Sequence, residues 1–358
     1  MDKRQDDSDI WEELFMKHYP YELAQMQSLP LDMKVRMTQR RIREWYDNWD
    51  GEVFVSFSGG KDSTVLKHIV DEMYNDVPSV FVNTGLEYPE IQKFAISQKN
   101  TITIRPKMRF DEVIKYYGYP IVSKEIAKNV QYARSGGEQN CHYKKLFGTL
   151  MYKGEKSAYC SEKWKFLYDA PFKISARCCD VMKKDPAHKY AKQTGRHTMT
   201  ATMAEESRLR KSAWMQTGCN NFGGKTPTST PMAFWTEQDV LRYIKKFDID
   251  YCKSVYGEIR SKHDDDELDG QMSVSDVLGF YGENELLETS NMKRTGCIFC
   301  MFGCHLEKEP NRFQRLKKTH PKQYDYCING GEMVDGYWQP NKKGLGLGKV
   351  LDYIGVNY

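Results

Sequence analysis

The sequence lacks the features that place a protein in a membrane or on a secretory route. No apolar run approaches the roughly 20 residues that a helix needs to cross a bilayer. Residues 1–7 are polar and charged, without the apolar core of a signal peptide. We therefore expect a cytoplasmic protein, in which the ten cysteines point to metal or thiol chemistry rather than to a disulfide framework.

Net charge is also nearly absent, because the formal charge of +4 over 358 residues is too small to indicate a partner. Its distribution is more informative. Residues 141–212 contain 16 lysines and arginines against 7 aspartates and glutamates. Such a stretch suits a polyanion, either a nucleotide or a nucleic acid, although a solvated lysine-rich surface explains it equally well.

The length allows one large or two modest domains, and no internal repeat is visible. We predict a helical N-terminal extension over residues 1–50 and a nucleotide-binding domain over residues 51–250, with a basic insertion near residues 136–173. A cysteine-rich C-terminal region over residues 251–358 is predicted to pack on that domain.

Apolar patterning predicts alternating strands and helices. Buried strands are expected at 53–55 and 80–82 and further strands at 101–104 and 198–203. Helices are expected at 31–49, 64–74, 113–117, 124–134 and 236–244. This alternation favours an α/β fold with a doubly wound, mainly parallel sheet. The segment 136–173 has no clean period and is predicted to be an insertion or lid, and the acidic segment 263–270 an exposed loop.

A glycine turn between the first strand and its helix is the strongest motif. Residues 58–63 read S-G-G-K-D-S. Two glycines let main-chain N–H groups approach an anion, the helix N-terminus adds its positive dipole end, and Lys61 adds a charge. The common phosphate loop would need glycine where Val55 stands, so this loop is of another kind. Since ligands lie beyond the carboxyl ends of parallel strands, we expect the end of strand 80–82 beside it.

The loop resembles the pyrophosphate-binding loop of the adenine-nucleotide alpha-hydrolase superfamily. Within it, the chain resembles the phosphoadenylyl-sulfate (PAPS) reductase family from about residue 30 to 320. Residues 82–85, V-N-T-G, are similar to the family's D-T-G motif with asparagine in place of aspartate, and residues 204–208, A-E-E-S-R, are similar to its E-S-x-x-R region.

The resemblance implies that the chain binds ATP or an adenylyl sulfate-type nucleotide, with Mg²⁺ bridging the phosphates. The implied nucleotide-binding residues are Ser58, Gly59, Gly60, Lys61, Asp62, Ser63, Thr84, Gly85, Ser207, Arg208 and Arg210. Among them, Lys61, Asp62 and Arg208 are the implied catalytic residues.

The cysteines extend the resemblance to assimilatory adenylyl-sulfate reductases, in which a Cys-Cys pair and a later C-x-x-C hold a 4Fe-4S cluster. The matching residues here are Cys178, Cys179, Cys297 and Cys300. The same four cysteines also suit a tetrahedral Zn²⁺ or an unligated structural role, and Cys304, His305 and Cys327 compete as ligands. The other four cysteines are expected to be ordinary residues: Cys141, Cys160, Cys219 and Cys252.

One departure matters for the activity. The reductases resemble one another in a C-terminal E-C-G-[IL]-H segment with a nucleophilic cysteine, and here no cysteine follows Cys327. The resemblance therefore favours a PAPS-reductase-like enzyme that uses an iron–sulfur cluster in sulfur transfer. It allows a nucleic acid as the acceptor, a thiol or sulfur-donor protein as a partner, and oligomers. The alternatives are a sulfonucleotide reductase that releases sulfite, and a catalytically silent subunit of a defence or mobile-element assembly.

Overall fold

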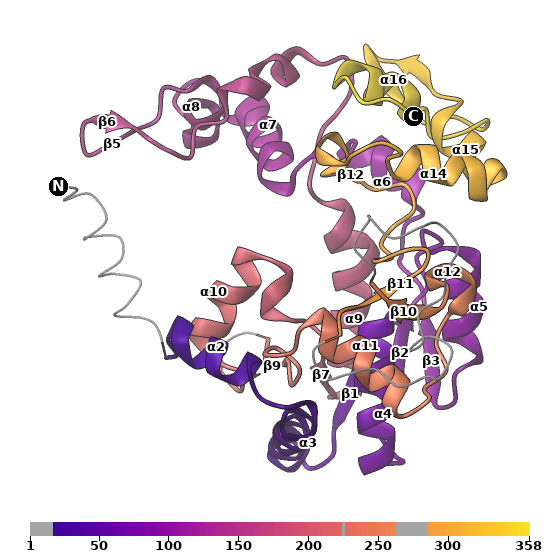
Figure 1. Ribbon diagram of the computed structural model, residues 1–358. Helices are drawn as coiled ribbons and strands as arrows, with labels where there is room; N and C mark the ends of the chain where they lie inside the picture. The colour runs from indigo at the N-terminus through magenta and orange to yellow at the C-terminus, as the bar shows by residue number, and fades with distance from the viewer. Residues whose placement is uncertain (1–16, 224–225, 263–284) are drawn as a thin grey trace. The chain divides into compact units, whose positions relative to one another are not determined.

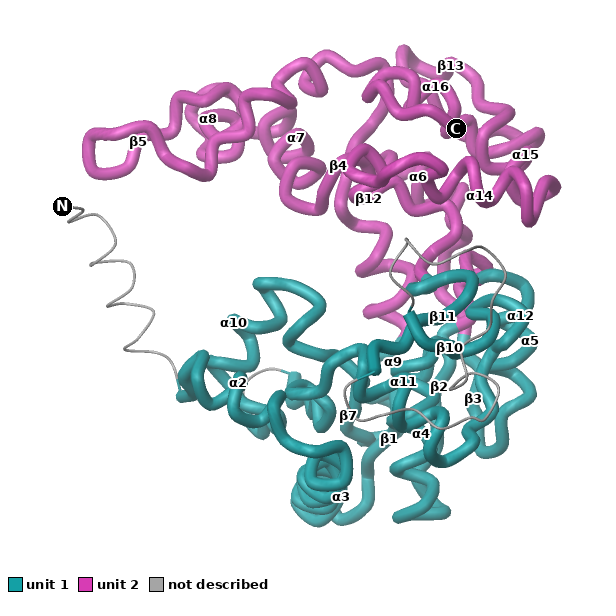
Figure 2. Tube along the Cα trace, viewed as in Figure 1, with its two compact units in different colours: residues 1–82, 88–104, 187–295 teal, residues 83–87, 105–186, 296–358 magenta. Residues whose placement is uncertain are grey.

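The computed structural model describes residues 17–223, 226–262 and 285–358. The predicted acidic loop at 263–270 and the first part of the predicted N-terminal extension lie outside these residues. The chain forms two compact units, shown in teal and magenta in Figure 2. Unit 1 comprises residues 1–82, 88–104 and 187–295, and unit 2 comprises residues 83–87, 105–186 and 296–358. These two units are interleaved along the sequence, whereas the predicted domains follow one another with limits near residues 50 and 250. The predicted domain limits stay a prediction.

Unit 1 is built on a six-stranded, mainly parallel sheet (Figure 1). Its strands, in spatial order, are β3 (Thr101–Ile104), β2 (Ser79–Val82), β1 (Val53–Phe57), β7 (His197–Met199), β9 (Thr228–Ser229) and β8 (Asn220–Asn221). The first five strands are parallel to their neighbours, and β8 runs antiparallel to β9. The α/β fold with a doubly wound, mainly parallel sheet is thus confirmed.

Helices accompany this sheet in unit 1. They are α2 (Pro20–Gln27), α3 (Leu31–Asn48), α4 (Lys61–Met73), α5 (Pro89–Ser97), α10 (Arg208–Thr217), α11 (Glu237–Lys246) and α12 (Lys253–Tyr256), with a 3₁₀ turn η3 (Ala204–Glu206). A small antiparallel pair, β10 (Ile259–Ser261) and β11 (Leu287–Thr289), lies near the C-terminal end of this unit's sequence. The predicted helices at 31–49, 64–74 and 236–244 are confirmed within a few residues.

The predicted strand at 198–203 is wrong beyond Met199. On one side, strand β7 pairs only with the two-residue strand β9, which ends at Ser229. The hydroxyls of Thr200 and Thr202 then hydrogen-bond to each other at 3.1 Å, which turns the chain towards η3. Alternating polar residues after Met199 are therefore a loop, not a strand continuation.

Unit 2 is mainly helical. Its helices are α6 (Phe110–Tyr117), α7 (Lys124–Gly136), α8 (Cys141–Phe147), η1 (Glu162–Asp169), the π-helix η2 (Asp180–Lys184), the 3₁₀ turn η4 (Cys304–Leu306), α14 (Arg312–Thr319), α15 (Pro321–Ile328) and α16 (Leu347–Tyr353); α9 (Asp185–Thr194) runs on into unit 1. Its strands form three pairs, β4 (Ile121–Val122) with β12 (Met301–Phe302), β5 (Met151–Tyr152) with β6 (Glu155–Lys156), and β13 (Glu332–Val334) with β14 (Tyr337–Gln339). The segment 136–173, without a clean period in sequence, therefore contains regular elements. Among the described residues, no helix is long and apolar enough to cross a membrane.

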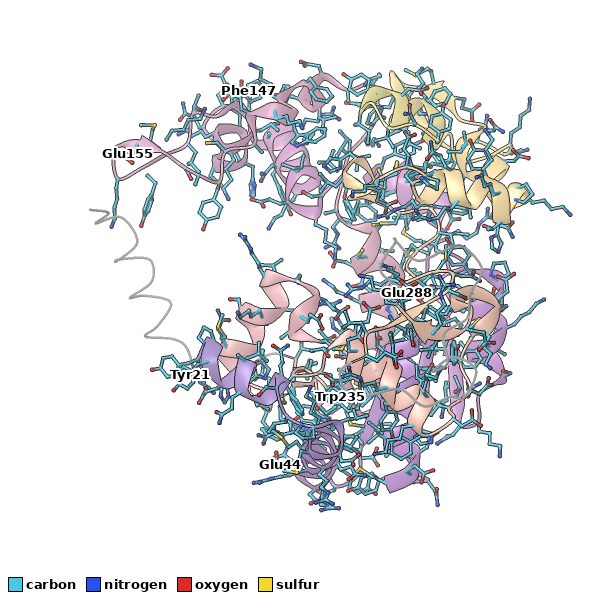
Figure 3. All side chains as sticks on the ribbon, viewed as in Figure 1. Tyr21, Glu44, Phe147, Glu155, Trp235 and Glu288 are labelled. Carbon is cyan, nitrogen blue, oxygen red and sulfur yellow. The ribbon has the colours of Figure 1, made fainter. Side chains whose placement is uncertain are left out.

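A buried ion pair fixes α3 to α11 in unit 1, close to Trp235, which is labelled in Figure 3. The Lys34 ammonium lies 2.7 Å from an Asp239 carboxylate oxygen, and both side chains are almost wholly buried. The same carboxylate accepts the N–H and hydroxyl of Thr236, the N-cap of α11. One aspartate therefore both caps a helix and neutralises a buried cation.

We expect Asp239→Ala to destabilise the protein by about 3–5 kcal/mol, because it leaves a buried ammonium without its counterion. The matched control is Asp32→Ala, which breaks the exposed Lys246–Asp32 pair and should cost less than about 1 kcal/mol. Urea unfolding followed by circular dichroism measures both. Equal losses for the two variants would show that the buried pair is not the stronger constraint.

Candidate functional site

The glycine loop 58–63 follows β1, the strand at which the strand order of the unit 1 sheet reverses. From β1 the chain adds β2 and then β3 on one side, whereas β7 and β9 lie on the other side. In open α/β sheets such a switch point, beyond the carboxyl ends of the strands, is where ligands bind. Phe57 pairs with Phe81, so the ends of β1 and β2 are adjacent, as the sequence predicts.

The two glycines give the loop its shape. Gly59 has φ of +72°, and a Cβ there would meet Ile91 Cγ2 at 3.0 Å and the Ile91 carbonyl oxygen at 3.1 Å. Gly60 is the N-cap of α4 and has no side chain to cap the helix. The first turn of α4 therefore presents main-chain N–H groups that a bound anion can satisfy.

Hydroxyl groups brace the loop from inside. The Ser58 and Ser63 hydroxyls lie 2.9 Å apart, and the Ser63 hydroxyl also accepts the Ser58 N–H and donates to the Gly60 carbonyl. The Ser58 hydroxyl accepts the Gly60 N–H at 3.3 Å. These two predicted residues therefore hold the loop's conformation in the structure.

The Lys61 ammonium is buried, with only 3% of the side chain exposed. It donates to the Lys293 carbonyl at 2.9 Å and lies 3.1 Å from a Glu237 carboxylate oxygen and 3.7 Å from Asp62. The two carboxylates are about 30% exposed, so solvent reaches the acidic side of this cluster.

The hydroxyl of Tyr256 covers the same loop. It accepts the Lys61 N–H at 3.4 Å and lies 2.6 Å from the Thr295 hydroxyl. Burial raises the pKa of Tyr256 to about 12, so this hydroxyl is neutral near pH 7. Sequence reasoning missed this tyrosine, because no motif marks a residue almost 200 positions from the loop.

Two arginines from separate segments of unit 1 meet at the Glu206 carboxylate. Arg210 forms an ion pair with Glu206, and Arg294 lies 3.8 Å from the same carboxylate. Burial and the neighbouring Arg294 charge lower the pKa of Arg210, and Asp62 partly offsets this. One carboxylate oxygen of Asp62 is buried without a hydrogen-bond partner among the described residues.

The predicted E-S-x-x-R region is only partly brought to this cluster. Ser207 is the N-cap of α10 and accepts the Arg210 N–H, whereas Arg208 begins the helix with an exposed side chain. Arg210 rather than Arg208 therefore forms the ion pair with Glu206. Arg294 is an addition that the sequence patterns did not indicate.

The second nucleotide motif begins unit 2. The Thr84 hydroxyl and N–H donate to the Glu87 carboxylate, and the Gly85 N–H donates to the Asn83 amide oxygen. Gly85 has φ of +73°, and no described atom lies within 4 Å of the position of a Cβ. The space beside Gly85 is thus open.

The four predicted metal ligands line one pocket of unit 2. The pocket residues are Leu86, Phe110, Pro120, Cys178, Cys179, Met182, Lys183, Cys297 and Cys300. The Ile298 N–H donates to the Leu86 carbonyl at 2.8 Å, which ties the C-x-x-C segment to the motif loop. Cys178 and Cys179 begin the helical segment that continues as η2.

The thiols in this pocket differ in acidity. A hydrogen bond donated by Cys178 lowers the pKa of Cys179 to about 6, with three nearby lysines acting in the same direction, while the pKa of Cys178 is raised. Burial raises the pKa of Cys297 to about 11. Burial of the Lys183 ammonium is more than offset by Cys297 and Glu87, so the pKa of Lys183 is raised. Only their nearness to Cys179 and Thr84 in the sequence could have indicated Lys183 and Glu87.

The pocket offers a donor set rather than a formed coordination sphere. Among the described residues, no three His, Cys, Asp or Glu side chains are arranged to hold a metal ion. The two sulfurs of the vicinal pair lie 3.9 Å apart. Cys304 instead donates to the Met301 carbonyl, and Cys327 is buried with a pKa raised well above the usual value by burial. All ten cysteines are free thiols.

Comparison with known families matches the phosphoadenosine phosphosulfate reductase domain over residues 52–136 and 137–301. The chain belongs to this family. A curated relative, an uncharacterized protein of Methanocaldococcus jannaschii, is 29% identical over 86 residues, which cover 22% of this chain and 21% of the relative. The chain thus matches about a fifth of that relative's length.

Solved structures show more distant likenesses. They are the phosphoadenylyl-sulfate reductase of Candida auris (TM-score 0.34, 14% identity, 63% of this chain and 91% of that one), the FMN adenylyltransferase of Candida glabrata (0.37, 10%, 76% and 82%) and the U34-tRNA thiolase NcsA of Methanococcus maripaludis with its [4Fe-4S] cluster (0.32, 14%, 62% and 66%). The family assignment therefore rests on the sequence match.

We expect Gly59→Ala to weaken pyrophosphate binding at least roughly tenfold, because the positive φ and the contact with Ile91 force the loop to shift. Gly355→Ala is the matched control, since Gly355 has φ of +68° but no described neighbour within 4 Å of a Cβ. Isothermal titration with pyrophosphate measures the affinity of each variant. Unchanged affinity in Gly59→Ala would contradict the assignment of this loop.

Proposed function

We propose that the chain is an enzyme that binds ATP or an adenylyl nucleotide at loop 58–63 and transfers sulfur with the help of an iron–sulfur cluster held by Cys178, Cys179, Cys297 and Cys300. The observation that carries the proposal is the buried Lys61 ammonium at the uncapped N-terminus of α4. Membership in the reductase family supports an enzyme of adenylyl-nucleotide chemistry.

The loop suits a pyrophosphate leaving group. Phosphate oxygens would accept main-chain N–H groups at the start of α4 and would take the Lys61 ammonium from Glu237. Charge that builds on the departing pyrophosphate would then be stabilised by groups already in place. In the structure the Glu237 carboxylate is the anion beside the Lys61 ammonium. A bound nucleotide would have to displace this carboxylate or share the ammonium with it.

The groups around Asp62 would handle the remaining charge. The Asp62 oxygen that lies 3.7 Å from the Lys61 ammonium accepts no hydrogen bond among the described residues and would accept Mg²⁺ or water bound to it. Arg210 and Arg294 present guanidinium groups to Glu206 and would bind sulfate or phosphate oxygens. Arg208, implied by the family resemblance, would reach the substrate only as an exposed side chain.

The donor set of the unit 2 pocket fits an iron–sulfur cluster, because four cysteine thiols and no competing carboxylate line it. When bound, the cluster would supply an iron site that carries sulfur. Lys183 lies in the same pocket and would balance thiolate charge. Zn²⁺ uses the same four ligands and would make the pocket a structural clip.

A sulfonucleotide reductase is the second candidate, favoured by the description of the matched family. It needs a thiolate nucleophile outside the cluster. Cys327 is a poor candidate, since burial raises its pKa well above the usual value. Sulfite release from a sulfonucleotide would favour this candidate, and exchange of pyrophosphate into ATP would favour the first.

Lys61→Ala should lower pyrophosphate affinity at least roughly a hundredfold, since it removes the cation nearest the helix N-terminus. Glu237→Gln should raise affinity without Mg²⁺, up to roughly tenfold, because the competing carboxylate is lost. Calorimetry without added Mg²⁺ measures both, and Glu258→Gln, an exposed residue paired with Lys253, is the control. Unaltered binding in Lys61→Ala would remove the basis for a nucleotide site.

Anaerobically purified protein should contain about four irons and four sulfides per chain and absorb near 400 nm. A double Cys297→Ser/Cys300→Ser variant should lose both iron and colour, whereas Cys141→Ser, which changes an exposed cysteine, should keep them. Metal and sulfide analysis provide the measurement. One zinc and no iron would replace the cluster by a structural site.

A further inference from the structure

An arm of unit 2, formed by α7, α8, the β5–β6 hairpin and η1, is not used by the proposed chemistry. In Figure 2, α8 and β5 lie at one end of unit 2, away from α14 to α16. Phe147 and Glu155, labelled in Figure 3, mark α8 and the hairpin. The arm exposes large side chains, among them Tyr152 at 66% and Tyr159 at 71%. A large exposed aromatic surface on an ordered element indicates an interaction site.

Arg134 gives the arm a fixed base. Its guanidinium donates to four carbonyl oxygens of the segment around η1, those of Leu167, Tyr168, Ala170 and Phe172, at 2.8–2.9 Å. The guanidinium group therefore hydrogen-bonds to main-chain carbonyls rather than to a carboxylate, and burial lowers the pKa of Arg134. The surface of the arm is thus supported by a rigid scaffold, which reduces the entropy lost when a partner binds.

Lysines lie beside aromatic rings on this arm in what we call the basic–aromatic track, made of Lys128, Tyr132, His142, Lys145 and Tyr159. The ammonium of Lys128 lies 5.9 Å from the Tyr132 ring centre, and that of Lys145 lies 5.7 Å from the Tyr159 ring centre. The Tyr132 and His142 rings stack at 5.0 Å. Three elements, α7, α8 and the loop before η1, therefore contribute to one surface.

The track is electropositive. Burial lowers the pKa of His142, and the charges of Lys128 and Lys145 act in the same direction. The His142 ring is oriented by the Asn129 amide oxygen at 2.8 Å. None of the track's lysines forms a described ion pair within 4 Å, whereas Lys156 of the hairpin is paired with Glu162. The cations of the track are therefore available to an anionic partner.

We propose that the basic–aromatic track binds single-stranded nucleic acid, with bases stacked on the exposed tyrosine rings and phosphates on the lysines. Aromatic rings next to cations suit a strand that offers both unstacked bases and phosphates. An acidic protein segment would use the lysines but would gain little from the ring faces. A duplex keeps its bases stacked inside, so it would use the charges alone.

This inference deepens the proposed function, on which it rests for its purpose, by giving the class of molecule that would receive sulfur. The binding itself is independent of loop 58–63. A Lys61→Ala variant that loses pyrophosphate binding should bind an oligonucleotide as the wild type does. Failure of the proposed function and failure of this inference are therefore seen in different measurements.

The experiment uses fluorescence anisotropy of the full chain with labelled 15-nucleotide RNA and DNA single strands of one sequence, from 50 to 300 mM salt. Tyr159→Ala should weaken binding roughly 5- to 100-fold, the usual effect of losing one stacked base. Lys145→Gln should reduce the slope of log affinity against log salt by about 0.7. A preference for RNA or DNA identifies which strand the track accepts.

Two matched controls carry the same substitutions elsewhere in unit 2. Tyr116→Ala removes a tyrosine that is 69% exposed on α6, and Lys322→Gln removes an exposed lysine of α15; both should leave binding unchanged. Thermal unfolding checks that each variant is folded. The inference is overturned if neither strand binds at 50 mM salt, if Tyr159→Ala and Tyr116→Ala behave alike, or if a duplex or polyglutamate competes as well as the single strand.

Discussion

A buried ammonium group at the start of a helix is the constraint on which unit 1 depends. Lys61 is held between the Lys293 carbonyl, the Glu237 carboxylate and Asp62, so three separate segments of the chain meet at one charge. An unpaired cation so deeply buried would be costly, and its surroundings are therefore tightly specified. The same requirement supports the proposed function of the loop, since a pyrophosphate in place of Glu237 would supply the counterion that Lys61 needs.

The two predicted nucleotide motifs lie in different units, and the four cysteines of the pocket lie in unit 2 with the second motif. Loop 58–63, Arg210 and Arg294 belong to unit 1, and each is placed by the loops that follow β1 and β7 or by the chain around Thr295. The segment 83–87 belongs to unit 2, where the Leu86 carbonyl accepts the Ile298 N–H. Within unit 2, the segment that follows the D-T-G-like motif is therefore tied directly to the cysteines proposed to hold the cluster.

Local patterns predicted what local forces decide. The strands at 53–55 and 101–104, the capped helix after Thr236 and the glycine loop follow from apolar runs, caps and backbone freedom, and the structure has them. Tyr256, Glu237 and Arg294 could not be predicted, because only tertiary packing brings the first two to Lys61 and Arg294 to Glu206. The strand expected to continue to residue 203 was wrong for the same reason, since the neighbouring β9 is too short to pair with it. Convergence of four cysteines on one pocket was anticipated only through the family resemblance.

The division into interleaved units restricts how the gene can be cut. The backbone passes from one unit to the other five times, at residues 82, 87, 104, 186 and 295. No single break in the chain yields a fragment that holds one complete unit and nothing else. Neither unit can therefore be fused or exchanged as one continuous segment. A chain that stops after residue 295 would leave its vicinal cysteines without the C-x-x-C segment. Recombination is therefore expected to preserve the nucleotide loop and the cysteine pocket together, as one heritable module.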